Sequence, residues 1–86
     1  MNVSVELTFS PLQDSYEPEI IRFIKAMRDS GLTVLENPLS TQVYGEYDAV
    51  MQVLAREMKQ SLGAVNQGVF LLKMVRGDRS GYAPHF

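Results

Sequence analysis

The chain has 86 residues, 45% of them hydrophobic, and a formal net charge of −2. That length fits one small domain with a single core, and because such a core is only marginally stable alone, association of subunits is expected. The slightly acidic balance argues against a nucleic-acid partner, whose binding surfaces are usually clustered and basic. The absence of cysteine excludes disulfides, thiolate chemistry and cysteine-based metal sites.

No apolar segment approaches the roughly 18 residues that suggest a membrane-spanning helix. The N-terminus also lacks a basic region followed by an apolar run, which a secretory signal would need. We therefore expect a soluble cytoplasmic protein that does not associate with a membrane.

The first predicted element is a half-buried strand over residues 2–10, because apolar and polar side chains alternate there. One face carries the apolar side chains Val3, Val5, Leu7 and Phe9. The other face carries the polar side chains Ser4, Glu6, Thr8 and Ser10. Pro11 has no N–H to donate to a neighbouring strand, so the strand should end there.

A helix should follow, with Asp14 or Ser15 as its N-cap and Pro18 in its first turn. Its apolar stripe is expected to consist of Ile20, Ile21, Phe23, Ile24 and Met27. The basic residues expected to face water are Arg22, Lys25 and Arg28. Gly31 is typical of the left-handed residue that stops a helix.

Two short strands are expected next, over residues 32–36 and 40–46, with a turn at Asn37-Pro38 between them. A second helix should have Asp48 in its first turn and end at Gly63. Its predicted stripe is Val50, Leu54, Met58 and Leu62. Residues 67–76 predict a last strand that is apolar on both faces apart from Lys73, and the pattern is lost after Gly77.

The order β-α-β-β-α-β is that of the ferredoxin-like α+β sandwich. Its antiparallel four-stranded sheet has the first and third strands in the centre and both helices on one face. We expect residues 1–76 to form this domain and residues 77–86 to form a C-terminal tail or arm. The other face of the sheet is left open. Its mixture of polar and apolar side chains favours contact with a second subunit, a ligand or both.

Two segments, "VSVELTFSPLQDSYEPEIIRFIKAMRDSGL" and "STQVYGEYDAVMQVL", resemble the thiamine/hydroxymethylpyrimidine-binding proteins related to YkoF. The shared features are a first strand ending in Pro-Leu, a Tyr before the first helix, "SGL" after it, and "ST-x-V-x-GE-x-D-x-V" leading into the second helix. The resemblance covers residues 3–76. It implies a domain that assembles through its sheets, as a multimer of single domains or a tandem pair, and that binds thiamine or its aminopyrimidine moiety without known chemistry. This chain looks like the single-domain form, so a homo-oligomeric dimer or tetramer is expected.

The ligand-binding candidates are chosen by the chemistry that an aminopyrimidine requires. Its ring needs a flat aromatic or apolar contact and its nitrogens need hydrogen-bond partners, while a thiazolium adds a positive charge. The third strand offers Ser40, Thr41, Tyr44 and Glu46. A second wall would come from Ser10, Leu12 and Tyr16 if the first and third strands are neighbours. A regular pleat puts Thr41 on the opposite face from Tyr44 and Glu46, unless a bulge at Gly45 intervenes.

Each candidate also has a structural explanation. Ser40 and Thr41 suit hydrogen bonding at a turn or strand edge, and Glu46 suits the positive end of a helix dipole. Tyr44 suits half-buried packing, and Tyr16 suits a hydrophobic contact that fixes the start of the first helix.

Enzymatic activity is not expected, since the chain has no Cys nucleophile, no His near a Ser and no GxxxxGK phosphate loop. No metal site or cofactor is predicted either. The first hypothesis is a non-enzymatic binding protein for thiamine or its hydroxymethylpyrimidine moiety. The alternative is a structural or regulatory oligomeric module with no small-molecule ligand, and a generic metabolite sensor is a third possibility.

Overall fold

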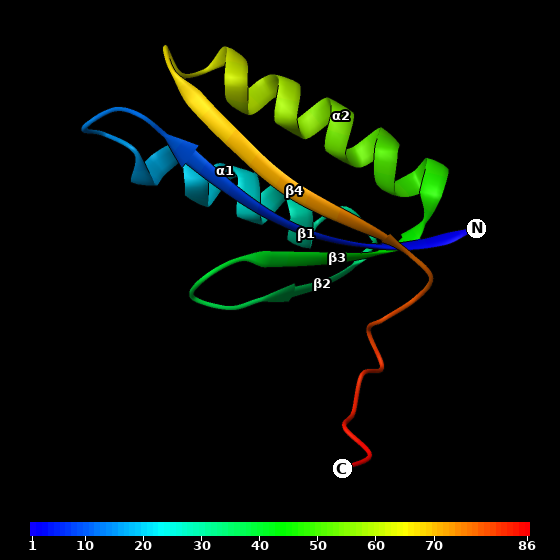
Figure 1. The fold of residues 1–86 in the computed structure, drawn as a ribbon. Coiled ribbons are helices and arrows are strands. Elements are labelled where there is room, and N and C mark those ends of the chain that lie inside the picture. Colours follow the sequence, from blue (N-terminus) through cyan, green and yellow to red (C-terminus); the bar gives the residue numbers. More distant parts are fainter.

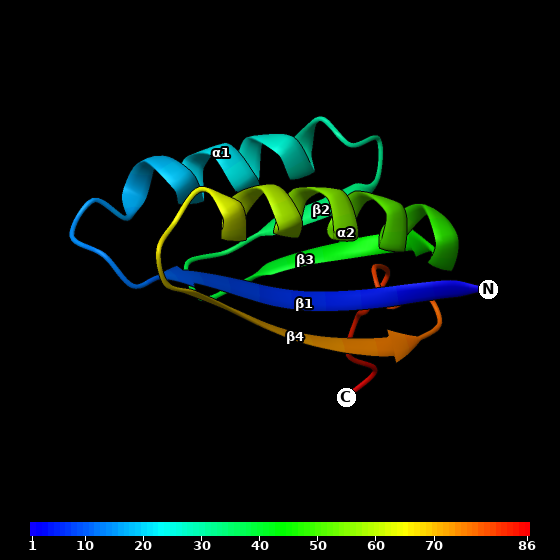
Figure 2. The same cartoon turned by 90° about the horizontal axis from the view of Figure 1, so that it is seen from above.

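The computed structural model describes residues 1–86 and has the predicted order of elements. These are β1 (Asn2–Pro11), α1 (Glu17–Arg28), β2 (Thr33–Glu36), β3 (Thr41–Glu46), α2 (Tyr47–Gly63) and β4 (Gly68–Arg76). The strands form one antiparallel sheet in the order β2-β3-β1-β4, with both helices on one side of it (Figures 1 and 2). The ferredoxin-like α+β fold is thus confirmed.

The alternation in β1 separates a covered face of the sheet from an open one. Val3, Val5 and Leu7 point toward the helices, and each is at most 2% exposed. The core that they begin is completed by Phe23, Met27, Val43, Val50, Val53 and Leu54. Apolar burial against α1 and α2 therefore determines which face of every strand is left uncovered.

Gly45 fits a close approach of β3 to the side chains that cover it. A Cβ at this position would lie 3.0 Å from a methyl of Leu32 and 3.3 Å from one of Val50. The pairing of β3 with β1 runs without interruption from Thr41 to Glu46, so no bulge is present at Gly45. Thr41 consequently lies on the covered face and Tyr44 on the open one.

The start of α1 differs in detail from the sequence prediction, whereas α2 has Asp48 in its first turn as predicted. Tyr16, not Asp14 or Ser15, is the N-cap of α1, and it makes no side-chain capping bond. The side chain of Gln13 donates to the carbonyl of Ser15 at 2.8 Å, which holds that residue in the preceding loop. In α2 the cap is Glu46, whose carboxylate accepts from the backbone N–H of Ala49 at 3.1 Å.

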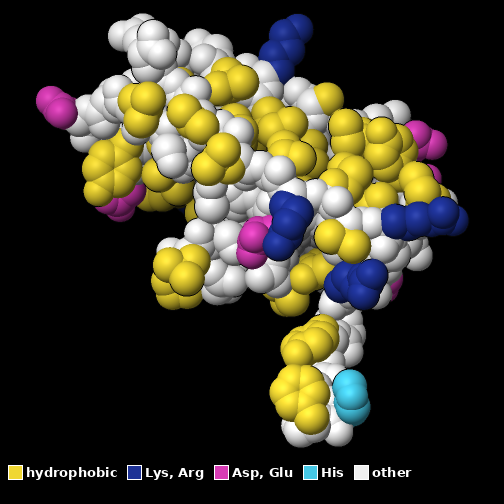
Figure 3. Space-filling model, in the orientation of Figure 1, with side chains coloured by type: hydrophobic (Ala, Val, Ile, Leu, Met, Phe, Trp, Pro, Cys, Tyr) yellow, Lys and Arg dark blue, Asp and Glu magenta, His cyan; other side chains and the backbone are white.

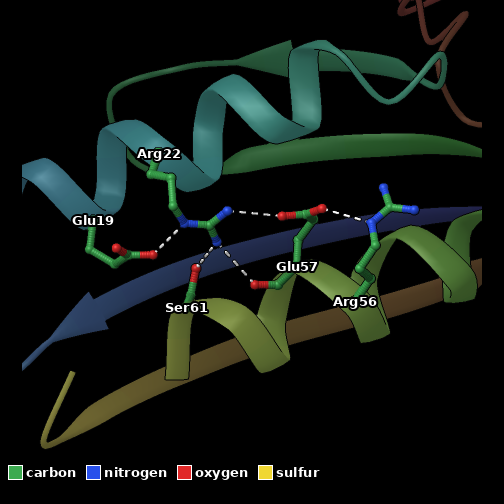
Figure 4. A network of polar contacts seen from close by, with 5 residues as sticks. All are labelled: Glu19, Arg22, Arg56, Glu57 and Ser61. Carbon is green, nitrogen blue, oxygen red and sulfur yellow. Dashed lines mark hydrogen bonds and ion pairs between the residues drawn. The ribbon is translucent and has the colours of Figure 1, made fainter. Parts of the chain in front are cut away.

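The contact between the helices corrects two further expectations. Arg22 does not face water but reaches across to α2, where it donates to Glu57 at 2.9 Å and to the hydroxyl of Ser61 at 2.6 Å (Figure 4). Glu57 and Ser61 are buried, whereas Leu62, predicted as part of the stripe, is 45% exposed. Val50 and Leu54 of the predicted stripe are buried and Met58 packs against the core, so only the C-terminal part of α2 departs from the prediction. There Glu57 and Ser61 are buried in contact with Arg22.

Residues 77–86 form no helix or strand and extend as an arm away from the end of β4 (Figure 1). Gly77 starts the arm with a φ of +103°, a conformation that only glycine adopts readily. Gly31, after α1, has a φ of +83°, as the helix-stop prediction required. Neither helix combines the length and the apolar character needed to cross a bilayer.

Candidate functional site

The open face of the sheet carries two rows of side chains across its three adjacent strands β3, β1 and β4. In the first row Ser4 lies between Tyr44 and Val75. In the second row Glu6 lies between Gln42 and Lys73. Neighbouring strands are only about 4.8 Å apart, so the six side chains form one continuous floor.

A hollow of about 570 Å³ lies on this floor. Its lining residues are Ser4, Val5, Glu6, Gln42, Tyr44, Lys73, Val75, Arg79 and Tyr82. Arg79 and Tyr82 belong to the C-terminal arm, so the arm supplies a wall and the sheet the base. The volume is in the range of sites that hold small organic ligands.

Hydrogen bonds orient the polar groups of the floor. The Tyr44 hydroxyl donates to the side-chain oxygen of Gln42 at 2.9 Å, which leaves the Gln42 NH₂ group available as a donor. The Glu6 carboxylate accepts from the Ser40 hydroxyl at 3.2 Å and lies 3.8 Å from the Lys73 ammonium. A donor and a charged acceptor therefore lie side by side, next to an aromatic ring.

The arm is tied to the floor by Ser4. Its hydroxyl donates to the carbonyl of Gly77 at 2.7 Å and accepts from the backbone N–H of Arg79 at 2.9 Å. The N–H of Gly77 also donates to the carbonyl of Asn2 at 2.8 Å. These bonds leave Ser4 only 7% exposed, although it lies on the open side of the sheet.

Of the predicted ligand-binding residues, the structure brings Tyr44 into the hollow. Ser40 is close to it through the bond to Glu6. Glu46 follows Tyr44 on the same face of β3, but its carboxylate is turned to the start of α2 and lies 4.0 Å from the N-terminal amine. Its structural role at the helix start is thus observed directly.

The other four candidates lie elsewhere. Thr41 is 9% exposed on the covered face, where it lines a smaller groove beside α1. Ser10 is six residues from Ser4 along β1, a separation of roughly 20 Å. Leu12 and Tyr16 are exposed in the connection between β1 and α1. The predicted second wall therefore lies at the opposite end of the sheet from the hollow.

Most of the residues that line the hollow are not among the predicted ligand-binding residues. Glu6 and Gln42 could have been found, because alternation and the pairing of central strands put both on the open face with Tyr44. For Arg79 and Tyr82 the sequence offers no comparable signal, since the arm has no periodic pattern.

The open face also carries exposed apolar side chains along β4, which has no strand on its outer edge. Val69 is 40% and Leu71 is 67% exposed, next to Ser10 and Thr8 of β1. Figure 3 shows hydrophobic side chains gathered over this part of the molecule and on the arm below it. Such a surface is suited to contact with another apolar surface.

No protein-family model and no curated protein match the sequence. Among solved structures, protein SP2199 from Streptococcus pneumoniae superimposes with a TM-score of 0.84 at 21% identity, covering 91% of this chain and 89% of that one. A protein from Thermotoga maritima, named for a proposed role in thiamine biosynthesis or salvage, gives a TM-score of 0.77 at 20% identity, covering 86% and 82%. A domain of unknown function, DUF77, from Bacillus cereus gives 0.76 at 16% identity, covering 96% and 83%. At these identities the likeness shows a shared fold.

Proposed function

We propose that this protein binds thiamine or its hydroxymethylpyrimidine moiety in the hollow on the open sheet face, and that it acts by binding and release without chemistry. The observation that carries the proposal is the pairing of Gln42 and Glu6 beside the ring of Tyr44. The fold shared with the Thermotoga maritima protein, and the motif order that resembles the YkoF-related binding proteins, support it.

The hydrogen-bonding groups of an aminopyrimidine match this pair. The free NH₂ group of Gln42 can donate to a ring nitrogen, while the Glu6 carboxylate can accept from the exocyclic amine. The Tyr44 ring offers a flat surface against which the pyrimidine can stack. A ligand held by these three groups lies across β3 and β1, at the base of the hollow.

Calorimetric titration with thiamine and with hydroxymethylpyrimidine tests the proposal. We expect Tyr44→Ala to weaken binding by about tenfold, since stacking of a base on an aromatic side chain contributes about 1–3 kcal/mol. Tyr16→Ala is the matched control, because it removes an exposed tyrosine at the other end of the sheet and should bind normally. Absence of heat and of a thermal shift at millimolar ligand would contradict the proposal. Loss of binding in Tyr16→Ala, with normal binding in Tyr44→Ala, would show that the ligand binds at the other end of the sheet.

The second candidate function is a structural or regulatory module whose open face is covered by another copy of the chain. The exposed Leu71 and Val69 beside the uncovered edge of β4 favour it. The two functions are compatible if subunits meet next to the hollow, and we propose a dimer or tetramer assembled through the sheets.

Light scattering with and without ligand separates these alternatives. An oligomer whose size does not change when ligand is added favours the structural or regulatory module. A monomer at micromolar concentration, with and without ligand, contradicts assembly. Leu71→Lys should dissociate the oligomer. Leu39→Lys, which changes an even more exposed leucine in the β2–β3 turn, should not.

A further inference from the structure

The C-terminal arm brings a charged side chain to the hollow in a fixed place. Gly77 turns the chain, and the Ser4 hydroxyl bonds the backbone on both sides of Asp78. The residue held by the second of these bonds is Arg79, which is one of the residues that line the hollow. Arg79 is therefore a built part of the site and not a residue of a freely moving tail.

The charges around the hollow are unequally balanced. The Glu6 carboxylate lies 3.8 Å from the Lys73 ammonium, and the charges of these two groups therefore offset each other. Asp78, next to Arg79 in sequence, is engaged by the N–H and hydroxyl of Ser80 at 2.9 and 2.6 Å. The guanidinium of Arg79 makes no ion pair or hydrogen bond with any group of the chain. One positive charge, with its donors free, is thus left at the wall of the hollow.

The position of Arg79 relative to Glu6 and Gln42, the two residues proposed to bind the pyrimidine, is also defined. Ser4, which holds Arg79, lies two residues from Glu6 on the same face of β1, a separation of roughly 7 Å. A ligand whose ring is held by Glu6 and Gln42 would therefore extend along β1 toward Arg79. A guanidinium binds the oxygens of phosphate in a bidentate manner, which a lone ammonium cannot do.

We propose that the hollow prefers a phosphate monoester of its ligand, with Arg79 as the residue that binds the phosphate and Ser4 as the residue that positions Arg79. The inference rests on the proposed function, since it adds an anionic group to the same aminopyrimidine ligand. The phosphate could be carried by hydroxymethylpyrimidine or by thiamine. The chemistry shared by both is a phosphate ester a few ångströms from an aminopyrimidine ring.

The test is a set of calorimetric titrations with four ligands: hydroxymethylpyrimidine, its monophosphate, thiamine and thiamine monophosphate. We expect the phosphorylated member of at least one pair to bind about tenfold more tightly, as a hydrogen-bonded charge pair allows. The pair in which this occurs identifies the carrier of the phosphate. Arg79→Gln should lower the affinity for the phosphorylated ligand by about tenfold and so abolish the preference.

Arg76→Gln is the matched control. It removes the same charge three residues earlier, from an exposed position at the end of β4 that does not line the hollow, and should keep the preference. Ser4→Ala should reduce the preference, and Ser4→Thr, which keeps the hydroxyl, should restore it. Far-ultraviolet circular dichroism of each variant checks that the fold is retained.

The outcomes separate this inference from the proposed function. Equal binding of both members of each pair, or an equal loss for both in Arg79→Gln, would overturn the role of Arg79 and leave the binding function intact. Failure of all four ligands to bind would overturn both. Inorganic phosphate should be titrated as well. If it binds as tightly as the phosphate monoesters, the hollow is a simple anion site that does not recognise the pyrimidine.

Discussion

The two faces of the sheet are built from the same strands but serve different purposes. Along β1, Val3, Val5 and Leu7 are buried under the helices, while the residues between them carry the hydroxyl and carboxylate of the hollow. Because the period of a strand is two residues, a side chain on one face can change without disturbing the other. The covered face supplies stability, and the open face is free to supply binding chemistry.

β4 departs from this division. It places Val69, Leu71 and Val75 on the open face, together with Lys73. Those apolar residues do not contribute to the core under the helices. Any stabilising contact that they make must therefore be on the open face of the sheet.

The largest effect is expected on the covered face. Leu7→Ala removes a side chain that is 2% exposed, and we expect it to lower the free energy of unfolding by about 2–5 kcal/mol. Leu71→Ala, the same change on the open face, should alter it by less than about 0.5 kcal/mol in the monomer. Urea denaturation at several protein concentrations measures both. A large cost for Leu71→Ala that grows with protein concentration would show the open face to be buried between copies.

A smaller effect should come from the charged contact between the two helices on the covered side. Hydrogen bonds from Arg56, and then from Arg22, hold the pKa of Glu57 below its ordinary value of 4.5. The unfolded chain therefore binds a proton at Glu57 more readily than the folded chain does. The stability that this carboxylate contributes is present above the ordinary value and is lost as the pH falls through the lowered pKa.

Glu57→Gln should consequently lower the free energy of unfolding by about 1–3 kcal/mol at neutral pH, since hydrogen bonds to a buried charge are lost. It should also flatten the fall in stability with acid. Glu36→Gln is the matched control: the hydrogen bond from Arg28 lowers the pKa of Glu36 too, but that pair is exposed and should contribute less. Urea midpoints from about pH 7 down to about pH 2 check both variants, because this range extends from full ionisation of a carboxylate to pH values below its ordinary pKa. If the urea midpoints of Glu57→Gln and the parent protein depend on pH in the same way, the Glu57 carboxylate does not contribute to stability.

The sequence predicted the division of the sheet better than it predicted the site. The alternation in β1 was sufficient to assign both its faces, and the split of Thr41 from Tyr44 followed from the pleat. The contact made by Arg22 was missed because a helical stripe shows only which residues share a face. Whether a charge at its edge meets water or a partner depends on how the second helix packs.

The arm was beyond prediction for a different physical reason. Its path is set by bonds to Ser4, whose partners lie 73 and 75 residues away in sequence. No local pattern near residues 77–82 reports such a contact. The residues that complete the hollow, Arg79 and Tyr82, could be located only once the first strand and the last were seen side by side.

The smallest expected effect tests that arm. Gly77→Ala and Gly31→Ala each force an alanine to a positive φ and should each cost about 1–2 kcal/mol of stability. Only Gly77→Ala should also loosen the bond between Ser4 and the N–H of Arg79, so exchange of that amide hydrogen should accelerate in this variant alone. Equal protection in both variants would mean that Ser4 holds the arm without help from the turn. Faster exchange in Gly77→Ala alone would show that the open face, unlike the covered one, depends on a single backbone turn for one wall of its hollow.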